Sequence, residues 1–139
     1  MFFKERWFGF DDGLYAGARL LEILSARADA NAALKALPDA VSTPELNLKM
    51  AEGEPFELVR RLREAALATP SCFPDAGEVI TLDGVRTEFA HGFGLARASN
   101  TTPVVVLRFE ADDAAALDAI QTTFRRAIDA VWPGLQLPF

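Results

Sequence analysis

The sequence predicts an α+β fold, in which residues 45–139 form an antiparallel sheet with two helices. Three observations predict it. Asp83 and Gly84 form an Asp-Gly pair between two β-prone runs, which is typical of a hairpin turn. Residues 103–109 are apolar on both faces, as a central strand is, and residues 112–132 repeat apolar side chains at helical spacing. The expected order of strand, helix, four strands and helix gives an antiparallel α+β domain.

The N-terminal part is expected to be helical. Apolar side chains at helical spacing predict a helix over 13–25, and Asp11 or Asp12 can cap it. The alanine and leucine content of 29–37 favours a second, short helix. Residues 38–44 are bracketed by two prolines and read as a linker. The expected division is therefore 1–37, a linker at 38–44, and a domain at 45–139.

The domain is expected to begin with a half-buried strand over 46–50, followed by a helix with Pro55 in its first turn. The apolar face of that helix is predicted at Phe56, Val59, Leu62 and Ala66. A two-residue turn at Asp83 and Gly84 would then place Leu82 opposite Val85 and Ile80 opposite Thr87.

Two more strands and a helix complete the expected domain. The strands are predicted over 93–98 and 103–109, joined by a short polar segment. The helix should begin near Asp112, whose charge suits a helix N-terminus, and end before Pro133. Its buried stripe is predicted at Leu117, Ile120, Phe124, Ile128 and Val131.

Composition narrows the function. The net charge of −6 disfavours nucleic acid and anionic membranes as partners, because both bind basic surfaces. No apolar run reaches the roughly 18 residues of a membrane helix. The single cysteine, Cys72, allows no intrachain disulfide, so the chain fits the cytoplasm. One cysteine and one histidine also make a zinc site improbable.

The segment Arg-Ala-Ser-Asn-Thr-Thr-Pro at 97–103 is the strongest candidate site. Arg97 offers a planar fork of donors that fits two phosphate oxygens. Ser99 and Thr101 add hydroxyls, and Asn100 adds an amide and tolerates a tight turn. Backbone N–H groups at such a turn can form an anion-binding concavity. The alternative is ordinary turn chemistry beside a surface arginine.

Other polar residues predict no site. The Asp11–Asp12 pair has too few carboxylates for a metal and is better explained as a helix cap. His91 is expected to face solvent, without an acidic partner near it in sequence. Cys72 has no basic neighbour in sequence and is expected to be unreactive.

Several segments together resemble one family. They are FFKERWFGFDDG at 2–13, LLEILS at 20–25, STPELN at 42–47, ITLDGV at 80–85, RASNTTP at 97–103 and VVVLRFEAD at 104–112. In these segments the chain resembles bacterial phosphomannomutase/phosphoglucomutase, of the α-D-phosphohexomutase superfamily. The resemblance implies a TATA-binding-protein-like fold for the last domain. It also implies that 1–37 is the tail of a third domain, so that the chain is a C-terminal fragment.

The resemblance further implies what the parent enzyme does. It would interconvert hexose 1-phosphate and hexose 6-phosphate of glucose or mannose, through a phosphoserine and a bisphosphate intermediate, with magnesium. The family's phosphoserine, metal and sugar-binding motifs are absent from this sequence. We therefore expect no catalytic residue, no metal ligand and no mutase activity in this chain. Its expected partners are the remaining domains of the parent and a phosphosugar.

The family's site residues fall on Arg97, Ser99, Asn100 and Thr101. The resemblance implies that these residues bind the phosphate of the substrate that is not being transferred. The alternative function is a free-standing binding or interaction module that uses the same fold.

Overall fold

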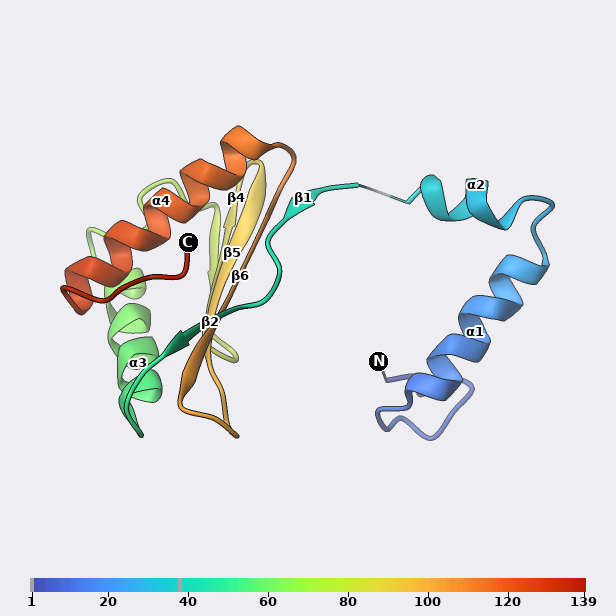
Figure 1. Cartoon of the computed structure of the whole chain (residues 1–139), viewed down its shortest axis with the longest axis horizontal. Coiled ribbons are helices and arrows are strands. Elements are labelled where there is room, and N and C mark those ends of the chain that lie inside the picture. The colour runs from blue at the N-terminus through green and yellow to red at the C-terminus, as the bar shows by residue number, and fades with distance from the viewer. Residues whose placement is uncertain (1, 38) are drawn as a thin grey trace. The chain divides into compact units, whose positions relative to one another are not determined.

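The computed structural model describes residues 2–37 and 39–139. Its backbone forms two compact units, one of residues 1–39 and one of residues 40–139 (Figure 1). The α+β class predicted from the sequence is confirmed, with an antiparallel sheet, two helices packed on it, and a helical N-terminal segment.

The N-terminal unit contains two helices, α1 (Gly13–Ser25) and α2 (Ala30–Lys35). Each begins at an aspartate, because Asp12 and Asp29 accept hydrogen bonds from backbone N–H groups of the first turn. The indole of Trp7 stacks on the ring of Tyr15, with centroids 4.5 Å apart. None of the described side chains of this unit is buried.

The second unit contains a six-stranded, wholly antiparallel sheet. Its strand order is β1-β6-β5-β4-β3, and β2 pairs with β6 beyond the end of β1. The strands are β1 (Val41–Ser42), β2 (Leu46–Lys49), β3 (Glu78–Ile80), β4 (Val85–Phe89), β5 (Gly92–Ala98) and β6 (Val104–Ala111). The prediction that residues 103–109 form a central strand is confirmed, since β6 has strands on both sides.

Two helices of the second unit, α3 (Glu54–Leu67) and α4 (Ala114–Val131), lie on the same face of the sheet (Figure 1). They bury its apolar face, and three phenylalanines form the centre of this core. The ring of Phe124 on α4 lies 5.2 Å from that of Phe109 on β6 and 4.8 Å from that of Phe73. The opposite face of the sheet carries no helix of residues 40–139 (Figure 1).

The expected linker differs from the structure in one respect. Val41 and Ser42 form β1 and pair with Ala111 and Glu110 of β6, and the N–H of Thr43 donates to the carbonyl of Phe109 at 2.9 Å. Pro38, the first residue of the expected linker, lies outside the described residues. The second unit therefore takes up most of the linker segment as an edge strand.

The predicted apolar face of α3 is wrong at its start. Phe56 is 53% exposed, and the buried positions are Pro55, Leu58, Leu62 and Ala66. These four positions repeat at intervals of three and four residues, so they lie on one side of the helix. Phe56 lies outside that stripe.

The predicted hairpin register is also wrong, by one residue. Val79 is opposite Thr87 and Ile80 is opposite Arg86, so residues 81–84 form a four-residue connection, the β3–β4 turn. Successive side chains of a strand alternate between faces, so the shift turns Val79 rather than Ile80 toward the core. Leu82 lies in the turn and is 95% exposed.

Candidate functional site

Three chain segments meet at one end of the sheet. The β5–β6 loop (residues 99–103) follows the end of β5, and α3 begins just after β2 at the same end. The N–H of Met50, at the end of β2, donates to the carbonyl of Pro103 at 3.1 Å. The β3–β4 turn is the third segment, because Val85 at the start of β4 pairs with Ala96 of β5.

The hydroxyl of Ser99 is the centre of the β5–β6 loop. Its Oγ lies 3.0 Å from Oγ1 of Thr102 and 3.4 Å from Oγ1 of Thr101. It also accepts hydrogen bonds from the backbone N–H groups of Thr101 and Thr102, both at 3.3 Å. Three hydroxyls are thus gathered within one tight loop, where they can donate to an anion, while the two N–H groups hold Ser99 Oγ in place.

The loop lines a cavity of about 90 Å³ that also touches the first residues of α3. The lining residues are Glu52, Gly53, Pro55, Phe56, Ser99, Asn100, Thr101, Thr102 and Pro103. Gly53 caps α3 in the left-handed region, at φ 82°, without a side-chain hydrogen bond to the helix. The N-terminus of a helix carries partial positive charge, which favours an anion beside the loop. The carboxylate of Glu52 opposes this locally.

Arg97 lies on the opposite face of β5 from its neighbours Ala96 and Ala98, which are buried under the helices. Its Nη1 donates to Oδ2 of Asp83 in the β3–β4 turn, at 3.3 Å. Both side chains are largely in solvent, 46% exposed for Arg97 and 68% for Asp83. The guanidinium is therefore accessible from solvent while one of its nitrogens contacts a carboxylate.

The structure brings together three of the four predicted site residues, since Ser99, Asn100 and Thr101 line one cavity. Arg97 is not among the residues that line it. Sequence reasoning missed Asp83 as a partner of Arg97. The sequence offered only part of the signal, the Asp-Gly turn itself, because the pairing of Val85 with Ala96 that brings this turn beside Arg97 depends on strand register.

Two other residues singled out in the sequence have clear environments. His91 is exposed as predicted, but its Nδ1 lies 3.1 Å from Oδ2 of Asp112, an acidic partner that sequence reasoning did not foresee. Cys72 is half-buried, and burial raises the pKa of its thiol, which disfavours the reactive thiolate.

Nowhere in residues 2–37 and 39–139 do three or more His, Cys, Asp or Glu side chains gather in a group that could hold a metal ion. The residues present thus do not fit the magnesium that the resemblance implies for the parent, and we assign it no ligand here. Within the same ranges, every helix is too short or too polar to span a bilayer.

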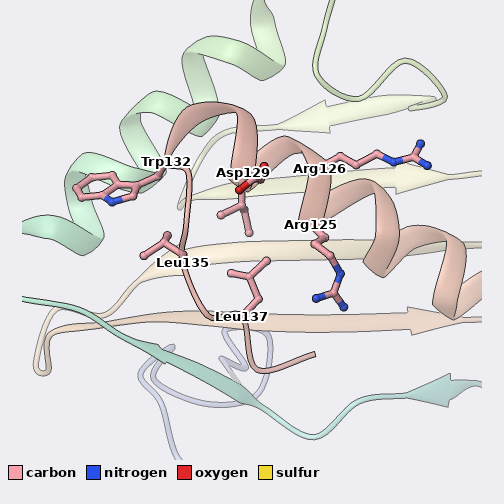
Figure 2. Close-up of a pocket in the computed structure, with 7 residues that line it drawn as sticks. Arg125, Arg126, Asp129, Trp132, Leu135 and Leu137 are labelled. Atoms are coloured by element: carbon pink, nitrogen blue, oxygen red, sulfur yellow. The ribbon is translucent and has the colours of Figure 1, made fainter.

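A larger cavity, of about 310 Å³, lies between the end of α4 and the C-terminal tail (Figure 2). Two of its charged side chains already have structural partners. Arg125 lies over the ring of Phe139 at 5.0 Å, and Asp129 accepts a hydrogen bond from the N–H of Gly134 at 3.3 Å. Leu135 and Leu137 of the tail lie against the same cavity. These contacts indicate a site where the tail packs on α4.

Comparison with known proteins identifies the domain that carries the β5–β6 loop. Residues 45–127 match the family described as "Phosphoglucomutase/phosphomannomutase, C-terminal domain". The chain belongs to this family. The match includes strands β2 to β6, the helix α3 and most of α4, so it covers the loop and every segment around it.

Relatives extend the likeness beyond that domain. The phosphoglucomutase of Neisseria gonorrhoeae is 56% identical over 137 residues, which are 96% of this chain and 29% of the relative. The phosphomannomutase/phosphoglucomutase of Pseudomonas aeruginosa is 49% identical over 140 residues, covering 100% of this chain and 29% of the relative. This family member therefore spans about 29% of the length of these curated relatives.

A solved structure agrees with the fold. The crystal structure of a phosphoglucomutase/phosphomannomutase family protein from Burkholderia thailandensis is 59% identical to this chain and superposes with a TM-score of 0.84. The superposition covers 99% of this chain and 28% of that protein. The α+β architecture is therefore that of the family's C-terminal region.

Proposed function

We propose that this chain provides the phosphate-binding domain of a phosphohexomutase. Arg97, Ser99, Asn100 and Thr101 bind the phosphate of a hexose phosphate that is not being transferred. The observation that carries this proposal is the cluster of hydroxyls in the β5–β6 loop: Oγ1 of Thr101 and Oγ1 of Thr102 lie within 3.4 Å of Ser99 Oγ, which also accepts from the N–H groups of both threonines. Thr102 joins the set, since its hydroxyl belongs to the same cluster.

The whole enzyme interconverts hexose 1-phosphate and hexose 6-phosphate of glucose or mannose. A phosphoserine gives its phosphate to the sugar, a bisphosphate intermediate turns over, and the serine takes back the other phosphate. The phosphoserine and the magnesium belong to other domains of the parent, in the cytoplasm. The loop contributes by positioning the sugar and closing the cleft, because it binds a phosphate at either end of the substrate. Without those domains, the chain has no mutase turnover.

The two units fit this assignment. Residues 1–37 are the tail of the third domain, and the last domain moves on the part of the 38–44 segment that precedes β1. The separation of the backbone into two compact units supports this division. The apolar side chains exposed on the N-terminal unit, among them Phe8 and Leu14, would pack within the rest of that domain in the parent.

A titration of the 139-residue chain with a hexose phosphate tests the proposal. Glucose 6-phosphate added to ¹⁵N-labelled protein should shift the backbone amides of residues 99–102 in a saturable way. Arg97→Ala should weaken the affinity about 10-fold or more, because a charge-assisted hydrogen bond contributes about 1.5–3 kcal/mol. Arg108→Ala is the matched control, since Arg108 is an exposed arginine of the neighbouring strand β6. Equal affinities of the Arg97→Ala chain and the unmodified chain would contradict the proposal.

A further inference from the structure

Asp83 forms an ion pair with Arg97, the arginine that we propose binds phosphate. Its Oδ2 lies 3.3 Å from Nη1 of Arg97, across 14 residues of sequence. Turn formation accounts for an aspartate before glycine, but it does not account for an ion pair with Arg97. The pair therefore calls for a reason beyond the turn.

The backbone of the β3–β4 turn holds Asp83 beside Arg97. Gly84 has φ +97°, a conformation that favours glycine, and a Cβ built there would lie 2.4 Å from the carbonyl oxygen of Ala96. The same Cβ would be 3.0 Å from Cα of Arg97. The turn is thus in close contact with the backbone of β5 at Arg97. As long as β4 and β5 are paired, Asp83 stays within reach of the guanidinium.

A carboxylate and a phosphate use the same donors of an arginine, because both accept hydrogen bonds from the planar guanidinium fork. The contact with Asp83 involves one nitrogen, is 3.3 Å long, and lies in solvent. Exposed pairs of this kind are weak and readily exchanged. A phosphate bound at Arg97 would also be repelled by the nearby negative charge of Asp83.

We propose that Asp83 is an internal competitor for Arg97, which occupies the guanidinium when no phosphate is bound and lowers its affinity for phosphate. This inference rests on the proposed function, because it takes Arg97 as a phosphate ligand. The competitor makes release of the phosphate easier. A domain that binds either end of the substrate in turn benefits, since the loop must let go of one phosphate before it binds the other.

The opposite role for Asp83 predicts the opposite result. If the carboxylate only orients the guanidinium toward phosphate, its removal weakens binding, because Arg97 then loses its preorganised position. If it competes, its removal tightens binding. Damage to the fold cannot imitate a gain in affinity, so the sign of the change separates competition from a merely structural role.

The test is a titration of the 139-residue chain with inorganic phosphate, followed by the amide shifts of residues 99–102 and the side-chain Nε–H signal of Arg97. Asp83→Asn keeps the size of the side chain and removes its charge. It should lower the dissociation constant about 2- to 5-fold, which is the size of an exposed ion pair. Asp118→Asn is the matched control: Asp118 is exposed on α4, so the net charge changes equally at another place. It should leave the constant unchanged.

A double variant separates the two proposals. In an Arg97→Ala background, Asp83→Asn should give a clearly smaller gain, because no guanidinium remains to be released. An Asp83→Asn chain that binds phosphate with equal or lower affinity overturns the competitor role, whatever Arg97→Ala does. An Arg97→Ala chain that binds as tightly as the unmodified chain, or no saturable shift in the unmodified chain, overturns the phosphate-binding function itself.

Discussion

The ring of Phe124 lies directly over Gly94, at the point where α4 crosses β5. A Cβ built on Gly94 would come within 2.3 Å of Cε2 of Phe124, closer than any real Cβ contact. The ring itself is fully buried and packs against Phe109 and Phe73. The absence of a side chain at Gly94 therefore sets how closely α4 approaches the sheet.

Replacing Gly94 by alanine should destabilise the second unit. The new methyl group would displace the ring of Phe124 from a tightly packed core, and such overpacking costs about 1–3 kcal/mol. The free energy of unfolding, measured by urea denaturation, checks this. Gly77→Ala is the matched control, because a Cβ there would have an ordinary contact of 3.8 Å with the carbonyl oxygen of Glu88. Similar stabilities for the two variants would contradict the prediction.

Thr87→Val should stabilise the domain. Thr87 is fully buried on β4, and within residues 2–37 and 39–139 its hydroxyl has no hydrogen-bond partner. A buried polar group without a partner costs about 1–3 kcal/mol, so an apolar replacement of similar shape should raise the free energy of unfolding. Thr123→Val should not, because the hydroxyl of Thr123 donates to the carbonyl of Ala119 at 3.0 Å. A less stable Thr87→Val chain would mean that this hydroxyl is satisfied in solution.

Acid should remove the contribution of Glu57 to stability. The guanidinium groups of Arg60 and Arg61 hydrogen-bond its carboxylate and lower its pKa from 4.5 to about 2. Because the folded pKa is depressed, the contribution is complete above pH 4.5 and is lost as the pH falls toward 2. Melting temperatures of the unmodified chain and Glu57→Gln should differ at pH 7 and converge near pH 2. Glu78→Gln, at an exposed carboxylate of β3, should show no such convergence.

Limited proteolysis should cut between the two units. The second unit begins at residue 40, and Val41 is already paired with Ala111 of β6. We therefore expect a resistant fragment that starts close to residue 40, while the N-terminal unit, with no buried side chain among its described residues, is degraded first. Mass spectrometry of the early products identifies the cuts. First stable cuts within residues 79–109 would refute this order.

Elements that depend on local signals could be predicted with accurate bounds. The helix expected over 13–25 is α1 (Gly13–Ser25), because Asp12 caps it and its apolar side chains repeat within one short segment. The last helix likewise follows an aspartate, Asp113, which accepts from the N–H of Ala116. Such signals involve residues close in sequence, so one chain is enough to find them.

The hairpin register could not be predicted, because the run Val79–Ile80–Thr81–Leu82 offers apolar residues in both phases of the alternation. The choice between phases is made by tertiary packing, since Val79 packs against the core of the second unit while Leu82 is exposed. The same holds for the helix α3, where the predicted face began at Phe56, but packing on the sheet buries Leu58 and leaves Phe56 exposed.

In the candidate site, too, local contacts could be predicted from the sequence and long-range contacts could not. Ser99, Asn100 and Thr101 are adjacent in sequence, so their meeting in one cavity was expected from the loop itself. The pairing of Arg97 with Asp83 and the approach of α3 to the loop join residues that are far apart in sequence. Those relationships follow from strand order and register, which the sequence pattern left open.

The chain contains two tryptophans, and each unit has one of them. Trp7 stacks on Tyr15 in the first unit. In the second unit the guanidinium of Arg61 lies over the ring of Trp132, with its Cζ 4.8 Å from the ring centroid. The two indoles therefore have different neighbours, and intrinsic fluorescence can report on the two units separately. In a Trp7→Phe chain all tryptophan emission would come from Trp132, so the unfolding of the second unit could be followed optically without any attached label.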